Sequence, residues 1–101
     1  MIVVNTTFHV ESSIAKEWVA WVHATYLVNA VERCSMSSPL FMKILTQMEG
    51  GEGYAVQLQC ESDEAAERWL NEQQPRLLAE MRSRWGERAL FFTTLMEEVR
   101  P

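Results

Sequence analysis

The sequence predicts an α+β protein, a ferredoxin-like β-α-β-β-α-β sandwich in which a four-stranded antiparallel sheet has both helices on one face. A glycine-rich turn at residues 48–54 divides the chain into two halves, and each half reads as strand, helix, strand. With 101 residues and 48% hydrophobic composition, the chain is long enough for one core and too short for two. We therefore expect a single domain over residues 1–101.

The first half begins with alternating apolar residues at 2–10, which predict a strand. Ser12 or Ser13 can cap the following helix, which we expect to run toward Asn29. The residues of its apolar stripe recur at spacings of three and four, as Ile14, Trp18, Trp21, Val22 and Thr25. The Ser-rich segment 33–39, closed by Pro39, predicts a loop before a second strand at 40–48.

In the second half, alternation at 54–60 predicts a third strand, and Ser62 is placed to cap a second helix. The apolar stripe of that helix comprises Ala66, Trp69, Leu70, Gln73, Leu77, Met81 and Trp85. Pro75 cannot donate its backbone amide, so we expect a kink or two abutting helices there. Gly86 is placed to end the helix, and alternation at 90–96 predicts the fourth strand. We expect Trp18, Trp69 and Trp85 to be buried between helices and sheet.

Right-handed crossovers place the first and third strands at the centre of the sheet. We expect the helix-facing side of the sheet to carry Ile2, Val4, Phe8, Val56, Leu58, Ile44 and Phe92. The opposite face would then hold a polar centre of Asn5, Thr7, His9, Gln57 and Gln59. Large apolar side chains of the edge strands would surround this centre, namely Phe41, Leu45, Phe91 and Leu95. Apolar side chains left uncovered in this way predict a partner surface.

Charge and composition exclude several classes of function. The net charge of −5 argues against nucleic acid and anionic membrane surfaces as partners, because both require a basic patch. The chain has no apolar run approaching the ~18 residues of a membrane span. It also lacks the basic segment and apolar stretch of a signal peptide, so we expect a cytoplasmic location. Cys34 and Cys60 form no CxxC motif and no ligand cluster with His9 or His23, so we expect free thiols, no metal and no cofactor.

Several short motifs together resemble a known family. They are residues 1–5, the pair Trp18 and Trp21, Tyr54-Ala55-Val56-Gln57, Pro75-Arg76-Leu77, Trp85-Gly86 and residues 91–94. In these motifs the chain resembles a family of small bacterial proteins catalogued as domain of unknown function 4286. That family is similar in layout to dimeric α/β barrel proteins, in which two ferredoxin-like sheets pack face to face. The resemblance implies a bacterial homodimer.

Two functional hypotheses remain open. The first is a non-enzymatic dimeric module that associates through the open sheet face, with Phe41, Leu45, Phe91 and Leu95 at the interface. The alternative is a small-molecule-binding protein, or a cofactor-independent oxygenase or isomerase, of the dimeric α/β barrel type. Its pocket candidates are the polar residues Asn5, His9, Gln57 and Gln59. We assign no catalytic residue, because His9 on a strand face is more often simply hydrogen-bonded and His23 lies beside the apolar stripe.

Overall fold

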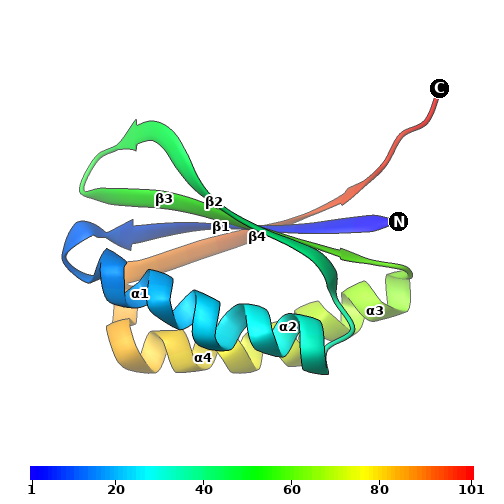
Figure 1. The fold of residues 1–101 in the computed structure, drawn as a ribbon, viewed down its shortest axis with the longest axis horizontal. Helices are drawn as coiled ribbons and strands as arrows, with labels where there is room; N and C mark the ends of the chain where they lie inside the picture. Colours follow the sequence, from blue (N-terminus) through cyan, green and yellow to red (C-terminus); the bar gives the residue numbers. More distant parts are fainter.

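The computed structural model describes residues 1–101 and has the expected order of strands and helices (Figure 1). The strands are β1 (Ile2–Glu11), β2 (Ser37–Met48), β3 (Gly51–Cys60) and β4 (Ala89–Glu97). The first helical arm consists of α1 (Ala15–Trp21), a π turn (Val22–Tyr26) and α2 (Leu27–Arg33). The second arm consists of α3 (Asp63–Arg68), a π turn (Trp69–Gln73) and α4 (Gln74–Trp85).

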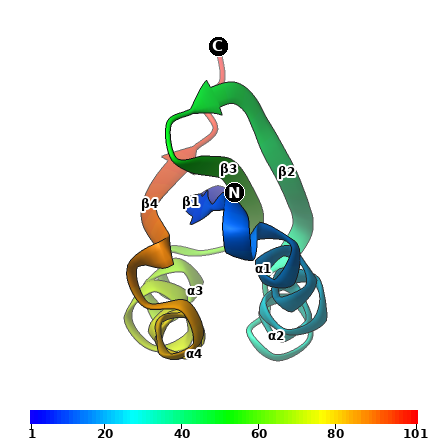
Figure 2. The same cartoon turned by 90° about the vertical axis from the view of Figure 1, so that its left-hand side faces the viewer.

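The strands form one antiparallel sheet in the order β2-β3-β1-β4, so the predicted central pair, β1 and β3, is confirmed. Both helical arms lie side by side against the same face of this sheet, and the other face carries no helix (Figure 2). The predicted ferredoxin-like α+β sandwich is therefore confirmed. We refer to the face without helices as the open face.

The ends of the second helical arm follow the sequence signals. The Ser62 side chain accepts a hydrogen bond from the Ala65 amide at 3.2 Å, which satisfies one of the free amides at the start of α3. Pro75 lies in the first turn of α4, directly after the π turn, so the expected discontinuity is present. Gly86 ends α4 with a φ of 58°, a conformation that glycine adopts without steric cost.

The core lies between the sheet and the two helical arms, and aromatic side chains dominate it. Phe8 of β1 contacts Trp18 with ring centroids 5.0 Å apart, and Tyr26 meets Trp69 at 5.8 Å. Trp18 and Trp69 are fully buried, as the sequence predicts. Trp85 is only half-buried, because it lies at the end of α4, where its ring packs edge-on against Trp21.

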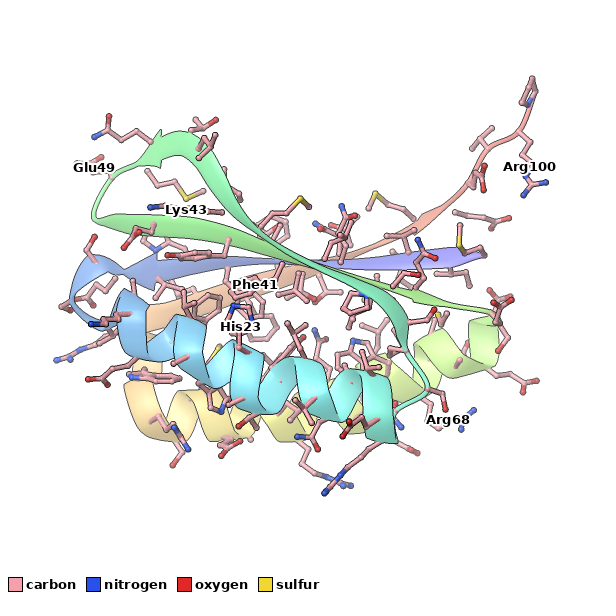
Figure 3. All side chains as sticks on the ribbon, in the orientation of Figure 1. His23, Phe41, Lys43, Glu49, Arg68 and Arg100 are labelled. Carbon is pink, nitrogen blue, oxygen red and sulfur yellow. The ribbon has the colours of Figure 1, made fainter.

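The edge strands face the opposite way from the prediction. Residues paired across an antiparallel ladder share a face, and Phe91 pairs with Phe8, Leu95 with Val4, and Phe41 with Val56. Phe41, Phe91 and Leu95 therefore belong to the helix-facing side. Conversely, Ile44 pairs with Gly53 and Phe92 with Thr7, so both belong to the open face. Figure 3 shows Phe41 below the sheet beside His23, and their ring centroids are 5.1 Å apart.

Several boundaries also differ from those expected, and β3 begins at Gly51, inside the predicted turn at 48–54. The first helical arm continues through α2 to Arg33, and β2 begins at Ser37, so the loop between them is shorter than the predicted 33–39. Pro39 lies inside β2, where pairing with β3 is irregular between Ser37 and Leu40. Such a position is tolerated because β2 is an edge strand and its outer side needs no amide donor.

Candidate functional site: the open sheet face

Polar side chains occupy the centre of the open face. Asn5, Thr7 and His9 alternate along β1, and β3 places Gln57 directly opposite Asn5. Gln59 lies two residues further along β3, opposite Val3. All of the predicted polar residues are half-buried rather than fully exposed. The structure thus brings together Asn5, His9, Gln57 and Gln59, the pocket candidates from the sequence, on one continuous strip.

Apolar side chains flank this polar strip on both edge strands. They are Leu40, Met42 and Ile44 of β2 and Leu90, Phe92 and Met96 of β4. Phe92 is the most exposed of them, at 61%. Sequence reasoning predicted the pattern of a polar centre with apolar flanks but assigned the edge strands one residue out of phase. It therefore missed Leu40, Met42, Ile44, Leu90, Phe92 and Met96 as members of the open face.

The predicted interface residue Leu45 lies beyond the regular part of the sheet. The pairing of β2 with β3 is interrupted between Ile44 and Met48, and Leu45 is 90% exposed. In this region the β2–β3 hairpin arches away from the helices and rises over the end of the open face (Figure 1). At the base of the arch, Lys43 and Glu52 form an ion pair at 2.8 Å, which raises the pKa of Lys43 and lowers that of Glu52.

The electrostatic character of the open face is neutral. Between Val3 and His9 on β1, the register places no Asp, Glu, Lys or Arg on this side of the sheet. A partner that covers this surface desolvates no charge, but the polar strip must still find hydrogen-bond partners. One polar group remains unsatisfied there: the Nδ2 of Asn5 donates to Thr7 Oγ1 at 3.3 Å, but the buried Oδ1 of Asn5 has no donor.

His9 lies at the hairpin end of the strip. Its Nε2 is 3.3 Å from the backbone carbonyl oxygen of Glu49, so the imidazole can donate to that carbonyl in one tautomer. No acidic or nucleophilic side chain hydrogen-bonds to the ring. This geometry matches a structural histidine that ties β1 to the hairpin turn.

A second polar cluster, which the sequence analysis missed, lies on the helix side inside the core. The amide Nε2 of Gln74 donates to Thr6 Oγ1 at 2.9 Å and to the Tyr26 hydroxyl at 3.0 Å. Thr93 completes the cluster, with its Oγ1 3.0 Å from that of Thr6. Burial raises the pKa of Tyr26 to about 12, because the phenolate cannot be solvated there.

Both π turns contribute to this buried cluster. A π turn inserts one residue into the helical repeat and thereby rotates the following side chains. Tyr26 is the last residue of the first π turn, and Gln74 directly follows the second. The indole Nε1 of Trp69, within the second π turn, is buried and has no acceptor. Tyr26 lies four residues after Val22, so it continues the apolar stripe of its helix and could have been found at that spacing.

The geometry defines the general class of this chain. It is a ferredoxin-like sandwich whose open sheet face is uncharged and apolar at its margins. The chain belongs to a family described as a domain of unknown function, DUF4286, whose model matches residues 1–99. No curated protein matches the sequence.

Solved structures share the fold at low sequence identity. A protein described as a candidate antibiotic biosynthesis monooxygenase from Deinococcus radiodurans has a TM-score of 0.71 at 12% identity, covering 100% of this chain and 95% of that one. An ethyl tert-butyl ether d (ethd) family protein from Bacillus halodurans has a TM-score of 0.68 at 9% identity, covering 98% and 100%. A variant of MhuD with two manganese protoporphyrin IX molecules bound per active site has a TM-score of 0.62 at 24% identity, covering 100% and 97%. At these identities the likeness is one of fold.

The remaining features of the chain concern metals, thiols and membranes. No group of three or more His, Cys, Asp or Glu side chains is arranged to hold a metal ion. Cys34 and Cys60 are free, and burial raises the pKa of both thiols. None of the helices combines the length and apolar character needed to cross a bilayer.

Proposed function

We propose that this protein is a self-associating module, a homodimer in which the open faces of two copies pack against each other. The observation that carries this proposal is the row of apolar side chains on β2 and β4, of which Phe92 and Leu40 expose 61% and 52% of their surface. Covering apolar surface is worth roughly 25 cal/mol per Å². Two copies related by a twofold axis present the same pattern to each other, so one surface can cover its own duplicate.

The polar strip also favours a second copy as the occupant. Asn5 Oδ1 is a buried acceptor without a donor, and an unsatisfied buried group costs about 1 to 3 kcal/mol. Gln57 lies next to Asn5 across the β1–β3 ladder and carries a side-chain amide with two N–H donors. This oxygen is buried within the single chain, so the Asn5 side chain has to rotate outward before the Gln57 amide of a second copy can donate to it. The apolar flanks would then supply most of the binding energy and the strip would set the register.

An edge-to-edge dimer is the competing arrangement. The outer edges of β2 and β4 are both unpaired within the chain, and free edges can add a strand. That arrangement would leave Phe92, Leu40 and the polar strip in contact with water. The face-to-face arrangement covers them, and for that reason we favour it.

Sedimentation velocity at micromolar concentration tests the proposal. We expect a dimer that Phe92→Asp dissociates while the circular dichroism spectrum stays folded, because a buried charge at an apolar interface is strongly unfavourable. Leu95→Asp is the matched control: Leu95 lies on the same edge strand with 47% exposure, but on the helix-facing side. A monomeric wild type, or a dimer that survives Phe92→Asp, would overturn the proposal.

A dimeric module of this kind requires no cofactor and no catalytic residue, so we propose a non-enzymatic role, in the cytoplasm. Reducing conditions there keep thiols such as Cys34 and Cys60 unpaired. The net charge of −5 gives no support to a nucleic acid or an anionic membrane as a further partner.

The second candidate function is small-molecule binding, extending to cofactor-independent oxygenase or isomerase chemistry. Two observations favour it: structural neighbours described as a monooxygenase and as a porphyrin-bound protein, and the convergence of Asn5, His9, Gln57 and Gln59 on one strip. A dimer would enclose that strip between two sheets. Native mass spectrometry of the dimer tests the idea, since a retained molecule lost on His9→Ala supports it and a ligand-free dimer contradicts it.

A further inference from the structure

On the helix-facing side, β4 carries apolar residues that the helices cover only in part. Phe91 and Leu95 share their face with the fully buried Phe8 and Val4 of β1, yet they are 43% and 47% exposed. β4 is the outermost strand, and the second helical arm lies on the same side of the molecule as β4 (Figure 2). The helical arm nevertheless leaves these two side chains partly uncovered. A concave strip therefore remains between β4 and α4.

This strip is a groove of about 400 Å³ between the second helical arm and β4, a size within the range of small-molecule sites. Its walls are apolar and include Leu70, Pro75 and Leu78 from the helical arm and Phe91 from the strand. A smaller hollow of about 110 Å³ toward Ala89 shares Leu78, Arg82 and Phe91 with it. An apolar molecule longer than one ring can therefore be accommodated.

The groove has one polar group on its inner side and one on its outer side. Gln74 lines it from the inside and is only 3% exposed. Its Nε2 donates to Thr6 and Tyr26, whereas its Oε1 has only the long 3.4 Å contact with Thr93. Arg82 lines the outer side of the groove and forms no ion pair, in contrast to Arg84, which pairs with Glu80 at 3.5 Å. An unpaired guanidinium beside apolar walls attracts an anionic head group.

We propose that the groove between α4 and β4 is a binding site for a small amphipathic anion, with an apolar body along Leu78 and Phe91 and its acidic head at Arg82. Gln74 lies at the inner end, where its side-chain oxygen can accept a hydrogen bond from a polar substituent on the body. This site lies on the opposite side of the sheet from the proposed dimer face and does not depend on the dimer. It also differs from the strip of Asn5, His9, Gln57 and Gln59.

The experiment is a titration of the full chain with decanoate, and with decanol as the uncharged match, followed by amide chemical shifts in nuclear magnetic resonance spectra. We expect saturable decanoate binding with shifts at residues 70–82 and 89–95, and weaker binding of decanol. Saturable shifts centred on the open face, or equal affinity for the two molecules, would overturn the proposal.

Two variant pairs test the location. Ala79 lines the groove from an exposed position on α4, so Ala79→Phe fills it without removing core packing. Ala24→Phe makes the same change at an exposed position on the first helical arm and is the control. We expect Ala79→Phe to weaken decanoate binding at least tenfold and Ala24→Phe to leave it unchanged. Equal effects of the two variants would contradict the site.

The second pair tests the head group. Arg82→Gln is expected to weaken decanoate binding by roughly fivefold, the effect of losing one partly exposed ion pair, and to leave decanol binding unchanged. Arg84→Gln removes a neighbouring cation outside the groove and should change the binding of neither decanoate nor decanol. Because all four variants lie away from the open face, their sedimentation should match the wild type. Failure of the dimer proposal is thereby distinguishable from failure of this one.

Discussion

A glutamine buried in an aromatic core is the most unusual residue of this chain. Gln74 avoids the cost of an unsatisfied amide because Thr6, Tyr26 and Thr93 surround it with hydroxyl groups. Each of these partners comes from a different element, so the cluster joins β1, β4 and both helical arms. The cluster therefore favours one arrangement of the helical arms on the sheet over alternatives that apolar packing alone would permit.

Tyr26→Phe tests this cluster through the pH dependence of stability. The pKa of Tyr26 is raised from 10.0 to about 12, so the folded chain keeps its proton where the unfolded chain loses it. The wild type should therefore lose about 3 kcal/mol of unfolding free energy between pH 10 and 12, a loss absent in Tyr26→Phe, with no such effect below pH 10. Near neutral pH the variant should be less stable by about 1 kcal/mol, for the lost hydrogen bond.

Urea denaturation at pH 8 and at pH 11.5 measures the difference. Other groups with raised pKa values, such as Tyr54 and Lys43, titrate in both proteins and cancel when the two are compared. Parallel stability curves for wild type and variant would show that Tyr26 is not held neutral by its surroundings.

Most core residues of the helices were predictable from spacing, including Leu77 and Met81 beyond the second π turn. Trp18 and Trp69 come before or at the start of the distorted segments, and their burial follows from the spacing. At the end of each π turn the buried residue differs by one from the predicted one, Tyr26 instead of Thr25 and Gln74 instead of Gln73. Spacing alone does not reveal the inserted residue, because Tyr26 still lies four residues after Val22 and Gln74 four after Leu70.

At the scale of elements, the central strands were predictable and the faces of the edge strands were not. In β1 and β3, large apolar residues mostly alternate with polar or small ones, so only one phase buries most of the apolar set. In β4, Leu90, Phe91 and Phe92 are consecutive, and β2 has the same pattern in Leu40, Phe41 and Met42. Either phase then buries apolar side chains, and only the register with the neighbouring strand decides between them.

The β2–β3 hairpin provides a prediction at this scale. A methyl group at Gly51 would collide with the backbone carbonyl oxygen of Val10, which is fixed in the β1–β3 ladder. At Gly53 the collision is with the thioether of Met48, a flexible side chain that can move away. We expect Gly51→Ala to cost about 2 to 3 kcal/mol and the control Gly53→Ala less than about 1 kcal/mol, by chemical denaturation. Equal losses of stability would mean that the backbone at Val10 moves to make room for the methyl group at position 51.

At the scale of the whole molecule, the open face is a consequence of topology. Both crossovers return on the same side of the sheet, so the helical arms cover one face and leave the other to solvent or to a partner (Figure 2). The order of elements predicts this asymmetry from the sequence alone. The sequence does not identify what covers the open face, because the same uncharged strip can receive a second sheet or a ligand.

Replacing Asn5 tests whether the dimer interface is polar at its centre or purely apolar. Asn5→Leu keeps the branching of the side chain at Cγ but removes the acceptor at the centre of the open face. If the partner's Gln57 amide donates to Asn5 Oδ1, the variant leaves that donor buried and unpaired in both copies. Each lost contact costs about 1 to 3 kcal/mol. The dimer dissociation constant should therefore rise by about tenfold or more.

Thr94→Leu is the control, because Thr94 pairs with Asn5 across the β1–β4 ladder but is exposed and lies among the apolar flanks. It should leave the dissociation constant unchanged or lower it. Sedimentation equilibrium over a concentration series measures both variants. Tighter association of Asn5→Leu would mean that the centre of the interface is dry and unpaired, since removing an unsatisfied acceptor then stabilises the dimer. Weaker association of Asn5→Leu, with Thr94→Leu unchanged, would instead mean that the strip fixes the register of the two sheets.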